Sequence, residues 1–175
     1  MNSQTLPTQT LSSPVPGLSW LPHPGTYGAA DDRCIVELAT LLGPLPTLRR
    51  RVTAEEATLT VAPSPDDCVL SLKLTGTALG GEELTFVSTA IESGADDSRL
   101  RIPGELATGD TTVSGVPATL ALRVVERTDT SLLVLGTTRV PYGPLRRTTG
   151  FALSRIRPAD RLRLLIAAEF TCHPA

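Results

Sequence analysis

Short stretches of alternating apolar and polar residues follow one another along most of the chain. The clearest spans residues 70–74, where three leucines alternate with Ser71 and Lys73. Successive side chains of a β-strand point to opposite faces, so this alternation predicts strands with one buried and one exposed face. By the same criterion we expect further strands at residues 33–39, 57–61, 84–91, 111–113, 120–124, 132–140, 148–153 and 161–170.

Helix is expected to be scarce. Glycine and proline interrupt the chain at intervals of roughly 8–20 residues, which leaves little room for long helices. One or two helical turns are predicted at residues 38–42 and 96–102, and residues 53–57 are a further candidate.

So many consecutive strands need either a closed barrel or a two-sheet sandwich, because each arrangement buries one face of every strand. Apolar alternation on nearly every strand, with aromatic residues at only 3%, favours a barrel that keeps some space inside. We therefore predict an all-β fold: a single antiparallel barrel of eight to nine strands, with one or two short helices.

Composition narrows the class of protein. The 175-residue chain is 41% hydrophobic and carries a formal net charge of -2. This balance excludes a nucleic-acid-binding protein that works by bulk positive charge, and it excludes an acidic disordered chain. Residues 1–17 are rich in Ser, Thr, Gln and Pro, so we predict a disordered tail there, followed by one domain at residues 18–172.

The cysteines indicate reduced thiols. The chain has three cysteines, an odd number, at the widely spaced positions Cys34, Cys68 and Cys172, and no CxxC pair occurs. Residues 1–17 lack the basic start and the apolar run of a secretory signal, and no apolar run reaches the roughly 20 residues that span a bilayer. We expect a cytoplasmic protein with no stable membrane insertion.

Several segments resemble the YceI-like family. Residues 108–117, TGDTTVSGVP, are similar to the family's turn of pattern G-x-L-T-[IV]-x-G-V-T, which precedes an apolar strand. Softer similarities in strand and turn pattern occur at residues 20–24, 33–39, 49–61, 70–74, 86–91, 98–101 and 161–170.

The chain also departs from that family in two places. Residues 97–100 are shorter than the family's helical insertion and lack its histidine, and residues 102–105 lack its Phe-Pro pair. With these exceptions the resemblance spans residues 20–170. It implies a lipocalin-like antiparallel barrel with a long apolar cavity for a polyisoprenoid-type lipid.

This implication leads to a functional hypothesis: a non-enzymatic binding or carrier protein that holds an isoprenoid lipid or a similar hydrophobic small molecule. Ligand cavities are mostly apolar, with few polar anchors. The apolar side of the predicted strands supplies such a lining: Val36, Leu38, Leu70, Leu72, Leu74, Phe86, Leu120, Leu122, Val124, Leu164 and Ile166. The alternative is a barrel filled by its own side chains, with no cavity.

Arginines are the candidate head-group contacts. Lys73 is the single lysine, and the other basic residues are arginines that fall near turns and strand ends. A guanidinium group binds phosphate or carboxylate through two parallel hydrogen bonds, so Arg49, Arg51 and Arg146 are candidates for an anionic head group. The alternative is a solvated outer face balanced by nearby acids, and the net charge of -2 favours it.

Motifs for catalysis and metal binding are absent from the sequence. His23 and His173 lie near the two ends of the domain, and even with Cys172 they do not form a recognisable ligand set. We therefore expect no metal, no cofactor and no catalytic residue.

An enzyme remains an alternative to the carrier. Such an enzyme would cyclise or isomerise a terpenoid-like or polyketide-like substrate in the same cavity. It would be favoured by an inward-facing Tyr142 or by an inward-facing carboxylate at Glu37, Asp110 or Glu169. Glu37 and Glu169 fall on the polar side of their strands, which argues against that role. A third possibility is an interaction module, in which a solid barrel forms a homodimer through exposed strand edges.

Overall fold

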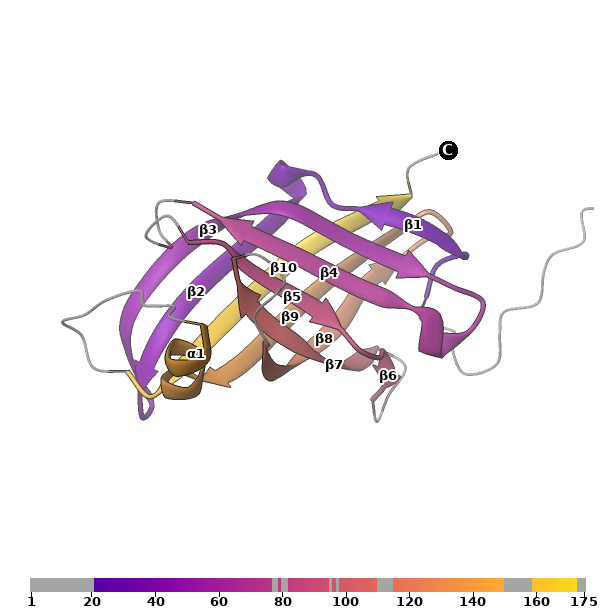
Figure 1. The fold of residues 1–175 in the computed structure, drawn as a ribbon. Helices are drawn as coiled ribbons and strands as arrows, with labels where there is room; N and C mark the ends of the chain where they lie inside the picture. Colours follow the sequence, from indigo (N-terminus) through magenta and orange to yellow (C-terminus); the bar gives the residue numbers. More distant parts are fainter. Residues whose placement is uncertain are drawn as a thin grey trace, which may run out of the picture.

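The structure is a computed structural model that describes residues 21–76, 79, 82–94, 96, 98–109, 115–149 and 159–172. It is built almost entirely from strands (Figure 1). The strands are β1 (Gly25–Gly28), β2 (Cys34–Leu42), β3 (Leu45–Val61), β4 (Val69–Thr75), β5 (Leu84–Ser88), β6 (Glu92–Ser93), β7 (Arg99–Thr108), β8 (Val116–Arg127), β9 (Ser131–Pro141) and β10 (Arg161–Cys172). One α-helix, α1 (Tyr142–Thr149), and two 3-10 turns, η1 (Asp31–Arg33) and η2 (Pro65–Asp67), complete the described elements.

The long strands form a closed antiparallel barrel in the order β2-β3-β4-β5-β7-β8-β9-β10, and β10 pairs back with β2. Closure gives the edge strands of the meander a hydrogen-bonding partner, which an open sheet would leave unpaired. Two short strands are added to it: β6 pairs with β7, and β1 pairs with both β3 and β10 just beyond the start of β2. The predicted single antiparallel lipocalin-like barrel is confirmed.

Irregularities in the pairing let the longest strands curve around the barrel. The register shifts between Thr40 and Leu41, between Ala54 and Glu56, and between Val124 and Glu126. An extra residue on one strand bends that strand and increases its twist. The 17-residue strand β3 can therefore run along the whole barrel (Figure 1).

The predicted scarcity of helix is confirmed, but the predicted helix positions were wrong. Residues 38–42 belong to β2, residues 53–57 lie inside β3, and residues 99–102 begin β7. In each case pairing with two neighbouring strands overrides the weak helical preference of a short segment. The helix α1 instead follows β9, where the sequence indicated a turn, and Pro144 is tolerated because it lies in the first helical turn. A strand was also predicted at residues 148–153, but residues 148 and 149 are the last two of α1. The rest of that segment and the predicted strand at residues 111–113 lie outside the described part.

Both ends of the barrel are covered by described residues. At one end, α1 inserts Tyr142 and Leu145, which are part of the hydrophobic core. At the other end, Leu21 and Tyr27 join the same core, and the Tyr27 hydroxyl donates to the His23 carbonyl oxygen at 2.7 Å. These two ends are called the α1 end and the β1 end below.

Candidate functional site

The interior of the barrel is the candidate site that the sequence predicts. Most of the predicted lining residues point inward and belong to the core, whereas Val124 is only partly buried against it. They come from β2, β4, β5, β8 and β10, and in each of these strands the side that the sequence predicts to face inward does so. Whether these residues contact a ligand stays a prediction.

The interior is filled by its own side chains. Leu38 has an exposed fraction of 0% and Leu72 of 2%, and the highest value among the predicted lining residues of the core is 6%, at Leu122. An empty channel wide enough for a lipid chain would leave the leucines that line it accessible to water. The described side chains therefore meet one another across the lumen, which is the filled-barrel alternative.

Residues that the sequence did not indicate also fill the lumen. From β7 these are Leu100, Ile102 and Leu106, all buried. They were missed because the start of this strand was interpreted as a helix, although leucine, isoleucine and leucine at even positions follow the strand period. Gly104 continues the same face, and the ring of Phe86 lies so close that a Cβ at Gly104 would meet its Cζ at 2.7 Å.

The few polar groups inside the barrel are hydrogen-bonded. The Thr138 hydroxyl donates to the Thr119 carbonyl oxygen at 2.7 Å, and the Ser88 hydroxyl accepts from the Leu70 amide at 2.8 Å. These hydrogen bonds offset the free-energy cost of burying the two hydroxyls. Both groups therefore serve the structure of the barrel wall.

Ionisable groups are scarce in the lumen. Glu37 and Glu169 face outward, and Glu169 forms an ion pair with Arg33. His23 is exposed. Asp110 and His173 lie outside the described residues. Within the described ranges, no group of three His, Cys, Asp or Glu side chains is placed to hold a metal ion.

Two acidic groups near the β1 end have perturbed pKa values. Burial raises the pKa of the Tyr27 phenol, with further contributions from Cys172 and Asp129. Burial also raises the pKa of the Cys34 thiol, and the charge of Asp31 adds to it. Both groups are therefore held in their neutral, unreactive forms, which suits packing and not nucleophilic chemistry.

The predicted head-group arginines are exposed and come from two different elements. Arg49 and Arg51 lie on the outer wall of β3 and are exposed, and Arg146 is exposed on α1. The segment of β3 that carries Arg49 and Arg51 pairs with β2. Whether these three arginines contact a head group stays a prediction.

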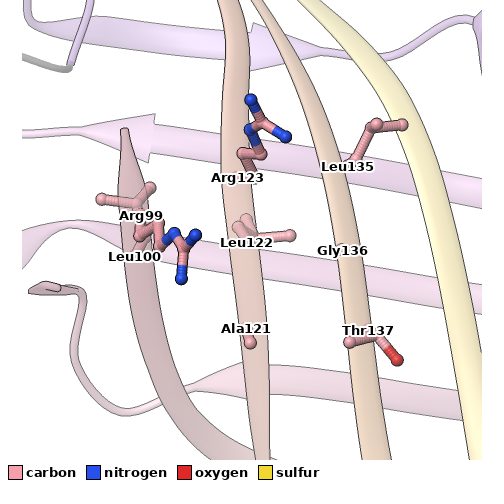
Figure 2. Close-up of a pocket in the computed structure, with 8 residues that line it drawn as sticks. All are labelled: Arg99, Leu100, Ala121, Leu122, Arg123, Leu135, Gly136 and Thr137. Atoms are coloured by element: carbon pink, nitrogen blue, oxygen red, sulfur yellow. The ribbon is translucent and has the colours of Figure 1, made fainter. Parts of the chain in front are cut away.

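Two shallow grooves lie on the outer wall and not in the lumen. One, of about 340 Å³, crosses β7, β8 and β9, and Figure 2 shows Arg123 and Leu135 on neighbouring strands beside it. The other, of about 420 Å³, lies nearer the α1 end and is bordered by Pro103, Thr119 and Arg139. Neither groove was indicated by the sequence, because each depends on which strands are neighbours.

No α-helix in the described ranges has the length and apolar character needed to cross a membrane. This is a finding about α-helices alone.

Comparison with known proteins supports the fold. No protein-family model matches the chain, and no curated protein matches it. Among solved structures the chain is similar to BcnA of Burkholderia cenocepacia, with 13% sequence identity and a TM-score of 0.54, over 81% of this chain and 98% of BcnA. A likeness at this identity shows the lipocalin-like barrel fold, and membership of the YceI-like family stays a prediction.

Proposed function

We propose that this protein is a binding or carrier protein for an apolar small molecule, which occupies the barrel interior in place of some of its own side chains. The observation that supports the proposal best is the chemistry of the lumen. From Leu145 at the α1 end to Leu21 at the β1 end, the core side chains are predominantly aliphatic. None of the buried side chains in the described ranges is a carboxylate, lysine, arginine or histidine. Such a lining suits a guest that brings no charge inside.

Binding would require the lumen to open, and α1 is the element that we expect to move. The helix has eight residues and contributes Tyr142 and Leu145 to the core. The helix is also held by a hydrogen bond from the Thr108 hydroxyl on β7 to the Thr149 carbonyl oxygen, at 3.1 Å. Withdrawing two large side chains costs about 3–6 kcal/mol, whereas burying ten methylene groups of a guest gains about 8 kcal/mol. Exchange of the helix for a lipid chain is therefore favourable on this scale.

An isoprenoid chain is the finer form of the proposal. Its branched aliphatic units match a lumen lined mainly by leucine, isoleucine and valine, and the resemblance to the YceI-like family points to the same class of ligand. A straight saturated chain is the natural comparison, because it has similar apolar area without the branches.

An enzyme is the second candidate, and Tyr142 is the observation that favours it. This phenol is buried at the α1 end, where a guest would enter. Replacement Tyr142→Phe removes its hydroxyl and retains the ring. If the barrel converts a bound terpenoid-like substrate, Y142F should abolish conversion and retain binding; a carrier would show no conversion with either chain.

The test of binding combines extraction with titration. The purified chain is examined by native mass spectrometry for co-purified lipid, and it is then titrated with geranylgeraniol and with a straight C16 alcohol. We expect one bound lipid, with tighter binding of the branched chain. If no lipid co-purifies and neither alcohol binds, the proposal is wrong.

Two variants at one position test the role of α1. Leu145→Ala should speed lipid uptake because it empties the α1 end, and Leu145→Trp should slow it because the larger ring blocks that end. Val87→Ala is the control, since Val87 lies on the outer wall at β5 and is 43% exposed. Equal uptake rates in all three variants would contradict access through the α1 end.

A further inference from the structure

The outer wall of β3, β2, β10, β9 and β8 carries a continuous set of residues on the outward side of the sheet that the filled lumen does not use. Strand register places them in three adjacent rows. We call the three rows together the outer patch. In order across the strands, the first row is Ile35, Ala167, Leu135 and Arg123, and the second is Arg51, Glu37, Leu165, Thr137 and Ala121. The third row is Arg49, Ala39, Arg163 and Arg139.

The first two rows place apolar side chains in water. Ile35 is 46% exposed, Leu135 is 48% exposed and Leu165 is 36% exposed. Ala167 pairs with both Ile35 and Leu135, so these residues adjoin one another across three strands. A contiguous exposed apolar surface of this kind, with charged residues around it, is typical of an interaction site.

The arginines of the outer patch lack the ion pairs that four other described arginines make. Arg33, Arg99, Arg101 and Arg161 each lie within 4.0 Å of a carboxylate. In the described part of the chain, no such pair involves the five arginines of the outer patch: Arg49, Arg51, Arg123, Arg139 and Arg163. The only carboxylate of the patch is Glu37, so the patch is strongly basic on a chain whose net charge is -2.

One pair of these arginines faces each other directly. Arg139 on β9 and Arg163 on β10 are register partners on the same outward face. Like charges placed opposite each other across a sheet destabilise it. The Nε of Arg163 is moreover buried without a hydrogen-bond partner. An anionic group between the two guanidinium groups would remove the repulsion and provide hydrogen-bond acceptors for them.

We propose that the outer patch docks the barrel onto an anionic lipid surface. The exposed Ile35, Leu135 and Leu165 would enter the boundary between head groups and acyl chains, and the third row of arginines would bind the phosphates beside it. Long arginine side chains reach head groups while their methylene stems stay against apolar surface. The groove of about 340 Å³ that Arg123 and Leu135 border in Figure 2 extends this surface toward β7.

The combination of residues favours a lipid surface over other partners. A second copy of the chain would bring its own outer patch, which offers five arginines and a single carboxylate, and would leave most of the positive charge uncompensated. A free phosphate ion would account for Arg139 and Arg163 but not for the exposed aliphatic rows. Only a surface that is anionic, with apolar chains at shallow depth below it, matches both the arginines and the exposed aliphatic side chains of the patch.

The inference uses residues other than those of the lumen, so it can fail or hold independently of lipid binding inside the barrel. The test is flotation of the full chain with vesicles of phosphatidylcholine alone and with vesicles that contain 40% phosphatidylglycerol. We expect binding only to the anionic vesicles, and we expect it to weaken as salt is raised, because exposed charges are screened.

Matched variants assign the binding to the outer patch. Arg139→Gln with Arg163→Gln should lower vesicle affinity by about 30-fold, since each arginine near an anionic surface contributes about fivefold. Leu135→Ser with Leu165→Ser should also lower it. The charge control is Lys73→Gln with Arg101→Gln, which removes the same charge from ion-paired residues, and the apolar control is Val87→Ser on β5. Thermal unfolding verifies that every variant is folded.

Several outcomes would overturn the proposal. These are equal binding to neutral and anionic vesicles, equal loss of affinity in the patch variants and their controls, or full competition by millimolar inorganic phosphate. A solution dimer that Leu135→Ser converts to a monomer would assign the patch to a second copy instead. Loss of lumen binding with intact flotation would leave the outer-patch proposal standing and would count against the function proposed for the interior.

Discussion

Replacement of Leu72 by alanine tests whether the lumen is filled. Leu72 lies on β4, is 2% exposed and pairs with Ala57 and Phe86 on the neighbouring strands. Removing its three terminal carbons forfeits about 2.4 kcal/mol of transfer free energy. If the surroundings do not collapse, a cavity of roughly 80 Å³ adds about 2 kcal/mol. We therefore expect L72A to lower the free energy of unfolding by about 2.5–4.5 kcal/mol.

Urea unfolding followed by circular dichroism measures this loss. Leu135→Ala is the control, because Leu135 is half exposed on the outer wall, and its cost should stay below about 1 kcal/mol. A cost at Leu72 as small as that at Leu135 would refute the reasoning, since it would mean that Leu72 lines open space. Added geranylgeraniol should restore stability to L72A more than to the unaltered chain if the new cavity accepts a lipid.

Three further predictions concern stability and reactivity. Gly104→Ala should destabilise the barrel by about 1–3 kcal/mol in urea unfolding, because the new Cβ would clash with the Val87 carbonyl oxygen; a neutral effect would contradict the close approach. The pKa of Tyr27 is raised by burial above its usual value of 10.0, so its contribution to stability is complete below that pH and is lost above it. Unfolding free energy should therefore fall with pH above about 10 more steeply in the unaltered chain than in Tyr27→Phe, and equal slopes would refute this. Cys34 and Cys68 are buried, so under native conditions both should react with iodoacetamide far more slowly than in urea, and fast native labelling at either would show that the wall opens there.

Strand patterning could be predicted because it is local. The alternation at residues 70–74 identifies both the strand β4 and its inward face, and the period of two holds for any paired strand. The inward faces of β2, β8 and β10 follow in the same way. Glycine and proline then mark the turns, and the number of strands leaves few architectures that bury one face of each.

Short helices and the contents of the lumen could not be predicted in the same way. Residues 38–42 and 99–102 have weak local preferences, and pairing with distant strands decides that they are β. Whether a barrel is hollow depends on how its side chains fit together across the lumen. Alternation is the same for a filled and an open interior, so only the packing in the tertiary structure distinguishes them.

The amino-acid sequence by itself therefore determined the strand-rich class and the inward face of most strands, because these follow from local periodicity and from the need to bury one face. It favoured a barrel over a sandwich, and the pairing of β10 with β2 and β9 closes that barrel. Only the tertiary structure decided which residues are neighbours across strands. Arg139 and Arg163 belong to different segments of the chain and become facing partners through the register of β9 and β10. The same register assembles the exposed aliphatic rows beside them, and it does so because hydrogen bonding between strands, and not proximity in sequence, sets the outer surface of a barrel.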